Sequence, residues 1–160
     1  PNRHETAVAV GTGAVIFNAL SGSRIKDTNF TWEGALSFDG NTGPYVQYTY
    51  ARASSVLRKA ACPDEGAAAG YVPSADETAL VKTLLRFPAR VDAALNEYEP
   101  SIVSRYVLDV CAAYNVFYHN CPILKSSGAE QAFRLRLTAA ARQIIGKSLD
   151  LLNIRRTEEI

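Results

Sequence analysis

Two tyrosines and an arginine are spaced so that they can share one face of a helix. Tyr45, Tyr48 and Arg52 follow Pro44, and on a helical wheel of about 100° per residue they fall within about 60° of one another. Tyrosine rings stack on unpaired bases, and a guanidinium adds charge and hydrogen-bond donors. The spacing therefore predicts a face equipped to bind single-stranded nucleic acid, provided that a helix begins near Pro44.

The residues around Pro44 carry the signals for that helix. The segment 39–43 is dense in turn formers, and Thr42 or Gly43 can cap a helix that has Pro44 in its first turn. A second stripe lies roughly 140° away on the same wheel and is apolar; it consists of Val46, Tyr50, Ala53 and Leu57. We therefore expect this helix to bury one side and to present the aromatic and basic residues on another.

A second pair of tyrosines, Tyr114 and Tyr118, lies four residues apart, which puts both rings on one helical face. The same face carries the apolar residues Val103, Val107 and Val110. Periodicity alone favours a core position for both tyrosines, because aromatic residues at helical spacing usually pack.

Other reactive residue types form no pattern typical of catalysis or metal binding. Cys111 and His119 fall on opposite sides of one predicted helix, so they cannot form a thiol–histidine pair. The Gly11-Thr12-Gly13 segment lacks the third glycine and the preceding strand of a phosphate loop. The three cysteines are odd in number and widely spaced, which favours reduced thiols in the cytoplasm. We expect no catalytic residue, no metal site and no cofactor in this chain.

Charge and hydropathy narrow the choice of partners only a little. The chain has 160 residues and a formal net charge of +1, a balance that neither indicates nor excludes nucleic acid. Several basic residues gather near the C-terminus, among them Arg134 and Arg142. The carboxylate pairs Asp64-Glu65 and Glu158-Glu159 are interpreted as solvated charge. No run approaches the ~18 apolar residues of a membrane span, so no membrane partner is expected.

Helical periodicity recurs along the chain without an alternating strand pattern, so the predicted fold is an all-α bundle. A capping box at Ser74 predicts a helix start, Pro88 predicts a break near Phe87, and residues 62–74 predict a surface loop with little to bury. The predicted helices span 5–20, 32–36, 44–61, a broken segment from Ser74 to Tyr98, 101–120 and 129–152. The stripe expected to be buried on the last of them is Phe133, Leu137, Ala140, Ile144 and Leu151.

Three blocks of sequence resemble the arginyl-tRNA synthetases. The first is W-E-x-A-L-S-F-x-G-x-T-G-P-Y-x-Q-Y-x-x-A-R, at residues 32–52. The second comprises residues 105–109 and 114–119, and the third runs from Arg134 to Ile154. Together they cover roughly 11–59 and 101–160, in the order that this family shows at the junction of its catalytic and anticodon-binding domains. The resemblance implies an all-α anticodon-binding helical bundle of the class I synthetases.

The resemblance also implies roles for individual residues. Tyr45, Tyr48 and Arg52 match positions that contact the anticodon loop, and it is for this reason that we assign Tyr114 and Tyr118 to the same surface. Each of the latter two rings would then pack on its edge and show a face. Ile160 matches a terminal apolar residue near the middle anticodon base, although Asn153 and the last six residues depart from the usual pattern. A loop that changes shape on tRNA binding corresponds to Ser37, Phe38, Asp39, Gly40, Asn41 and Thr42.

The family's activity would belong to a longer protein. Class I synthetases use ATP with Mg on a domain carrying H-x-G-H and K-M-S-K-S signatures, and neither occurs here. We therefore expect residues 1–20 to be a linking helix from the end of a missing catalytic domain, and residues 21–160 to be a helical anticodon-binding domain, inactive alone. The expected partners are tRNA(Arg) and that catalytic domain, but not DNA. Two alternatives stay open: the anticodon domain of a related enzyme such as cysteinyl-tRNA synthetase, and a helical protein-interaction module without RNA binding.

Overall fold

The computed structural model describes residues 2–27, 29–60 and 70–160. These residues form helices and no strands, which confirms the all-α prediction. The elements are α1 (Arg3–Ser21), α2 (Trp32–Leu36), α3 (Gly43–Lys59), α4 (Ala75–Leu84), α5 (Phe87–Glu97), α6 (Ser101–Asn120) and α7 (Gly128–Leu151).

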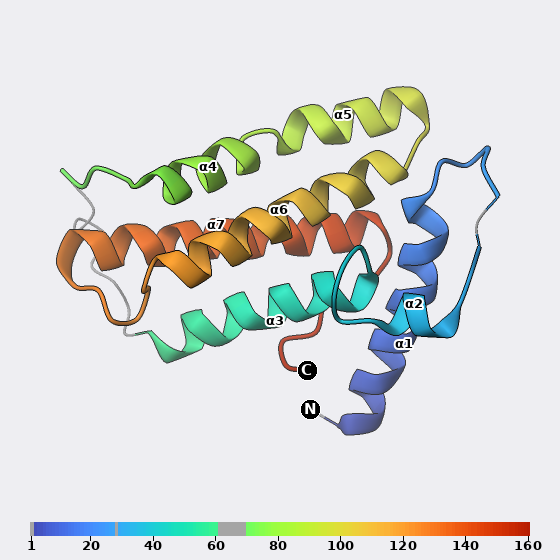
Figure 1. The fold of residues 1–160 in the computed structure, drawn as a ribbon, viewed down its shortest axis with the longest axis horizontal. Helices are drawn as coiled ribbons and strands as arrows, with labels where there is room; N and C mark the ends of the chain where they lie inside the picture. The colour runs from blue at the N-terminus through green and yellow to red at the C-terminus, as the bar shows by residue number, and fades with distance from the viewer. Residues whose placement is uncertain (1, 28, 61–69) are drawn as a thin grey trace.

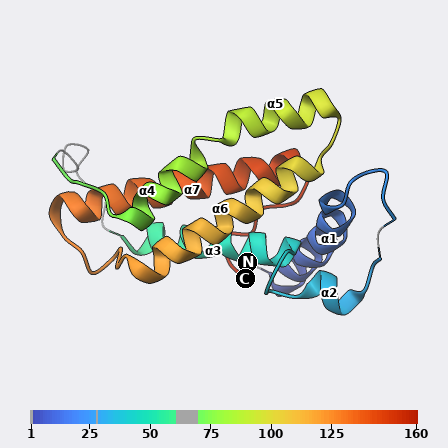
Figure 2. The ribbon, with the colours of Figure 1, turned by 45° about the horizontal axis from the view of Figure 1, so that its top comes forward.

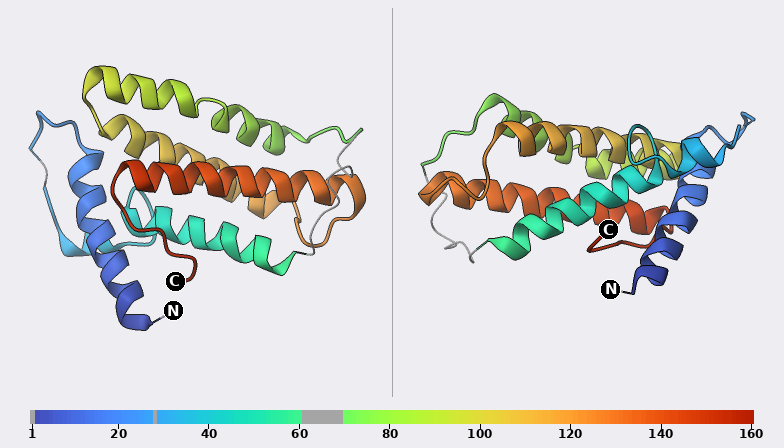
Figure 3. Two further views of the ribbon diagram at one scale, coloured as in Figure 1. Left: turned by 180° about the vertical axis from the view of Figure 1, so that it is seen from behind. Right: turned by 60° about the horizontal axis from the view of Figure 1, so that its bottom comes forward.

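Three long helices make the body of the bundle. Helices α3, α6 and α7 pack against one another, and α4 and α5 lie along the outer side of α6 (Figure 1). Helix α1 crosses the end of the bundle and contacts α2, α3 and α6, and the turned view shows it steeply inclined to the long helices (Figure 2). After α7 the chain turns back and runs across α3 (Figure 3). The C-terminal segment is thus brought onto the helix that carries Tyr48 and Arg52.

Local sequence signals set the helix ends. Thr42 caps α3, since its hydroxyl accepts a hydrogen bond from the backbone N–H of Tyr45 at 3.2 Å. Ser74 and Glu77 form the predicted capping box at the start of α4. Helix α4 ends at Leu84 and α5 begins at Phe87, one residue before Pro88, because a proline inside a helix removes a hydrogen bond and clashes with the preceding turn. These three predictions are confirmed.

The predicted buried stripe of α7 is wrong in part. Ala140 is exposed and Leu151 is 55% exposed, whereas Leu149, expected on the opposite side, is fully buried. Helix α7 contacts α3, α4 and α6, so apolar side chains are needed over much of its circumference. The sequence pattern therefore does not fix which face is most buried. The residues that α7 gives to the core are Leu135, Leu137, Ala141, Ile145 and Leu149.

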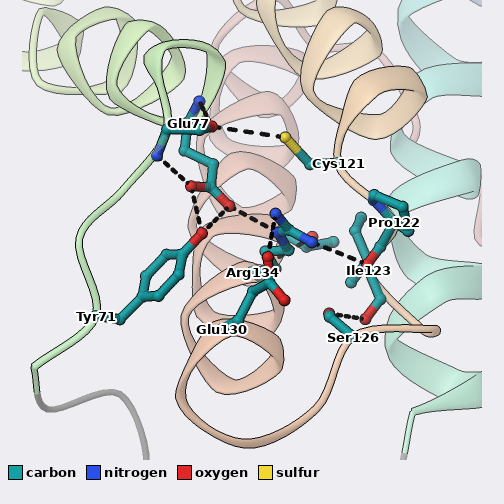
Figure 4. A network of polar contacts seen from close by, with 10 residues as sticks. Tyr71, Glu77, Cys121, Pro122, Ile123, Ser126, Glu130 and Arg134 are labelled. Atoms are coloured by element: carbon teal, nitrogen blue, oxygen red, sulfur yellow. Dashed lines mark hydrogen bonds and ion pairs between the residues drawn. The ribbon is translucent and has the colours of Figure 1, made fainter.

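A buried ion pair joins α4 to α7 (Figure 4). The Nε of Arg134 donates to Oε1 of Glu77 at 2.7 Å, and the backbone N–H of Ser74 donates to Oε2 at 2.6 Å. Burial by itself would raise the pKa of Glu77, but the hydrogen bonds from Arg134, Ser74 and Tyr71 outweigh it and hold the pKa below its ordinary value. Arg134 is buried, so it does not belong to the basic surface that the sequence suggested.

The described end of the predicted 62–74 loop also takes part in this network. Residues 61–69 lie outside the described residues, and with them the carboxylates Asp64 and Glu65. Tyr71 lies 5.3 Å from Phe133 between ring centroids, and its hydroxyl donates to Glu77 at 2.9 Å. The expectation that this segment has little to bury is wrong for Tyr71, because its ring packs on α7 and its hydroxyl bonds to a buried carboxylate.

Candidate nucleic-acid interface

The guanidinium of Arg52 lies over two tyrosine rings from different helices. Its central carbon is 4.7 Å from the ring centroid of Tyr48 on α3 and 5.2 Å from that of Tyr118 on α6. Both distances are within the range of cation–π attraction. Tyr48 is 39% exposed and Tyr118 is 40% exposed, so each ring keeps surface that a ligand can reach. The face predicted on α3 therefore exists, and it is completed by α6.

Asn115 connects two of the predicted site residues. Its side-chain oxygen accepts a hydrogen bond from Nη1 of Arg52 at 2.6 Å, and its side-chain nitrogen donates to the hydroxyl of Tyr45 at 2.9 Å. Tyr45 is half-buried, and this burial raises the pKa of its hydroxyl. The sequence gave no signal for Asn115, since the contact joins residues 63 positions apart.

Tyr114 does not show a face to solvent. It is fully buried, its ring centroid lies 6.2 Å from that of Tyr118, and burial raises the pKa of its hydroxyl. The expectation of a partly exposed ring is wrong, because α6 lies in the middle of the bundle and turns this position towards the core. Periodicity therefore predicted Tyr114 correctly but not Tyr118. Tyr114 can act on a ligand only through the neighbouring Tyr118 ring.

The loop before α3 reaches the same face. Phe38 makes an edge-on contact with Tyr48, with 6.2 Å between ring centroids and 83° between ring planes. The loop is held by its own hydrogen bonds: the Ser37 hydroxyl donates to the carbonyl of Asp39 at 3.0 Å, and the Thr42 hydroxyl donates to the carbonyl of Ser37. Gly40 has a φ of 85°, a conformation that glycine adopts without strain. Phe38 therefore extends the aromatic surface of Tyr48.

A groove of about 640 Å³ opens beside the aromatic face. Tyr48, Arg52, Tyr118 and Ile160, all predicted site residues, lie in its wall. Sequence reasoning did not assign to the site several basic or potentially basic residues that line the same groove, namely Arg58, Lys59, His119 and Lys125. Lys59 follows Arg52 by seven residues and so shares its face of α3. The other three come from α3, α6 and the loop before α7 and meet only in the fold.

Polar contacts hold the exposed C-terminal segment on α3 and α7. Oε1 of Glu158 accepts hydrogen bonds from the Tyr50 hydroxyl at 2.9 Å and from Nη2 of Arg142 at 2.6 Å. Arg58 pairs with Glu159 at 3.3 Å. Glu158 and Glu159 are exposed, as the interpretation as solvated charge predicts, but three groups on α3 and α7 also pair with them. These contacts place Ile160 in the wall of the groove.

The part of the chain that the structure describes contains no candidate metal site and no candidate membrane-spanning helix. Among its residues, no group of three or more histidine, cysteine or acidic side chains could hold a metal ion. Within the same ranges no helix combines the length and the apolar character that crossing a membrane requires. The geometry that remains is a groove in which basic residues outnumber the two carboxylates of Glu158 and Glu159, with aromatic rings and a guanidinium on its wall.

Tyrosine rings beside a basic groove are typical of domains that bind unpaired RNA, and this one is built on a helical bundle. Comparison with protein families defines the class more closely: the family described as the DALR anticodon binding domain matches residues 46–160. The chain belongs to that family.

Named relatives agree with this assignment. The arginine–tRNA ligase of Alkaliphilus metalliredigens is 42% identical over 99% of this chain, and that of Clostridioides difficile is 44% identical over 99%. The solved Thermus thermophilus arginyl-tRNA synthetase superposes with a TM-score of 0.94 at 34% identity over the whole chain. In each case the chain spans 28% of the relative's length.

Proposed function

We propose that this chain binds the anticodon loop of tRNA(Arg) as the anticodon-binding part of an arginine–tRNA ligase. One observation carries the proposal: Arg52 lies over the Tyr48 and Tyr118 rings at the wall of a basic groove. Unpaired bases are bound by stacking on aromatic side chains and by hydrogen bonds to their edges. Membership of an anticodon-binding family supports the same partner.

Each part of the site has a role in this proposal. The exposed surfaces of Tyr48 and Tyr118 stack on splayed-out bases, and Phe38 in the 37–42 loop enlarges the Tyr48 platform. Lys59 and Lys125 attract the phosphates of the loop. Ile160 offers an apolar contact in the wall of the groove. Tyr45 contributes through its hydroxyl, and the fully buried Tyr114 contributes by supporting Tyr118.

The chemistry of the parent enzyme is assigned to another domain. The relatives are named arginine–tRNA ligases. We place the arginine activation of the parent enzyme, with ATP and Mg, in a catalytic domain of the same polypeptide, in the cytoplasm. We further propose that residues 1–20, most of α1, link that domain to the bundle formed by residues 21–160. In this proposal the contacts of α1 with α3 would couple the catalytic domain to the helix that carries Tyr48 and Arg52.

The test is RNA binding by the full-length protein. Fluorescence anisotropy with an anticodon stem–loop of tRNA(Arg) should show binding that an unrelated stem–loop does not match, and Tyr48→Ala should weaken it by about 1–3 kcal/mol, the usual contribution of one stacked base. Tyr98→Ala, which removes an exposed tyrosine beyond the end of α5, is the matched control. Binding to a cysteine-tRNA stem–loop instead would favour the cysteinyl enzyme, and no RNA binding would favour a protein-interaction module.

A further inference from the structure

Asn115 occupies a position in which both ends of its side chain are used. On one side its oxygen accepts from Arg52, and on the other its nitrogen donates to Tyr45, at 2.6 and 2.9 Å. Arg52 and Tyr45 both belong to α3, seven residues apart, whereas Asn115 belongs to α6. The asparagine therefore links the two helices at the aromatic face.

The chemistry of these three side chains fixes the direction of every hydrogen bond. A guanidinium only donates, so the oxygen of Asn115 must face Arg52 and its NH₂ group must face Tyr45. The Tyr45 oxygen is then the acceptor in that contact, and its own O–H hydrogen is left to point elsewhere. Arg52 likewise keeps further N–H donors, since one of its five is engaged by Asn115.

We propose that Asn115 is a positioning residue that makes this part of the interface a surface of hydrogen-bond donors, selective for acceptor atoms of the RNA. It keeps Arg52 beside the Tyr48 and Tyr118 rings and turns the Tyr45 hydroxyl hydrogen outwards. The acceptors that fit are carbonyl oxygens or ring nitrogens of an unpaired base, and phosphate oxygens. This inference rests on the proposed RNA-binding function and adds the hydrogen-bonding preference of the site.

The surroundings of Asn115 favour this role over simple packing. It is half-buried and, together with Arg52 and Tyr118, lines a second, shallow hollow of about 460 Å³. The residues before and after it on α6 differ sharply in solvent exposure, since Tyr114 is fully buried and Val116 is 49% exposed. Asn115 thus lies at the edge of the core, where its polar ends and not its volume decide what it contacts.

The decisive variant is Asn115→Asp, which keeps the size of the side chain and reverses its polarity towards Tyr45. A carboxylate accepts from both sides, so the Tyr45 hydroxyl would donate inwards and be lost to the RNA. We expect Asn115→Asp and Tyr45→Phe each to weaken stem–loop binding by roughly 3- to 10-fold, the size of one net hydrogen bond. The double variant should bind no more weakly than Asn115→Asp alone. Asn96→Asp on the exposed side of α5 is the matched control for the added charge.

Two further measurements complete the test. Thermal melting of each variant shows whether weaker binding comes from a less stable fold. The salt dependence of binding shows whether the RNA acceptor is a base atom or a phosphate oxygen. Arg52→Gln removes the only charge among the side chains of Tyr45, Arg52 and Asn115. If it leaves the slope of log K against log salt unchanged, the acceptor is on a base; if the slope falls by about 0.7, the value for one phosphate on a single strand, the acceptor is a phosphate. Asn115→Leu, which removes both hydrogen bonds, should also weaken binding.

Three results would overturn the proposal: wild-type affinity in Asn115→Asp and Asn115→Leu, independent and additive losses in Asn115→Asp and Tyr45→Phe, or losses that merely follow the melting temperature. In each of these cases Tyr48→Ala can still weaken stem–loop binding. The proposed RNA-binding function would then stand, and only the role of Asn115 would be rejected. Normal binding by Tyr48→Ala and Arg52→Lys, in contrast, would remove the proposed function itself.

Discussion

Arg134 on α7 and Glu77 on α4 form an ion pair in the interior, with 2.7 Å between Nε and Oε1 and with both side chains buried. The guanidinium also donates to the carbonyl of Pro122 at 3.2 Å and pairs with Glu130 at 2.7 Å. One side chain therefore joins α4, α7 and the segment between α6 and α7. That segment carries Lys125 and lines the groove, so the buried pair supports the wall of the proposed interface from behind.

Arg134→Ala should lower the free energy of unfolding by about 3–5 kcal/mol. The substitution leaves the Glu77 carboxylate buried without its charged partner, and an uncompensated buried charge costs that much. Arg136→Ala, two residues along α7 on an exposed position, should change stability by less than about 0.5 kcal/mol. Urea denaturation followed by circular dichroism measures both. Equal effects of the two substitutions would show that the buried pair contributes no special stability.

The same pair predicts a dependence of stability on pH. The pKa of Glu77 in the folded chain lies below its ordinary value of 4.5, so its contribution is fully present above pH 4.5 and is lost as the pH falls towards and through the folded value. The difference in unfolding free energy between the wild type and Glu77→Gln should therefore shrink on acidification below pH 4.5. Denaturation at several pH values tests this, and a difference that stays constant down to pH 3 would contradict it.

Substitutions at Tyr114 should distinguish what its ring contributes to stability from what its hydroxyl contributes. Tyr114→Ala removes a fully buried ring and should cost about 3–5 kcal/mol of stability. Tyr114→Phe should cost no more than about 1.5 kcal/mol, because the ring keeps its packing and only the hydroxyl, with its contact to Thr138, is lost. RNA affinity should follow the same order, since the ring acts by supporting Tyr118. The measurements are thermal melts and stem–loop binding below the melting range, and weak binding by a stable Tyr114→Phe would contradict the supporting role.

The sequence predicted what depends on neighbours along the chain. The caps at Thr42 and Ser74, the break before Pro88 and the shared face of Tyr48 and Arg52 are all local, because each is set within one or two helical turns. Family resemblance added Tyr118 and Ile160, which the structure brings to the same groove.

What the sequence did not predict depends on how helices pack. Asn115 meets Arg52 only because α6 lies against α3, and Glu158 meets Tyr50 and Arg142 only because the chain after α7 returns over α3. The burial of Tyr114 is fixed by the same packing, since one helical face of α6 carries both core and surface positions. Such contacts leave no periodic pattern in the sequence.

The last prediction concerns the basic side of the groove. Lys59 on α3 and Lys125 before α7 are both exposed and line it. Of the two arginines in the same wall, Arg58 is paired with Glu159 and Arg52 is hydrogen-bonded to Asn115. Exposed ammonium groups in a groove beside stacking rings are placed to contact phosphates. Each phosphate contact on a single strand adds about 0.7 to the slope of log K against log salt. Replacing both lysines with glutamine should thus reduce the slope by about 1.4 and weaken binding most at low salt, with the melting temperature unchanged because neither lysine is buried. The control is a double substitution of Lys26 and Lys82 with glutamine, which removes the same charge from exposed positions outside the groove. The anisotropy titrations are repeated at several salt concentrations for both variants. A slope that falls equally in the two would mean that overall charge, and not this groove, attracts the RNA.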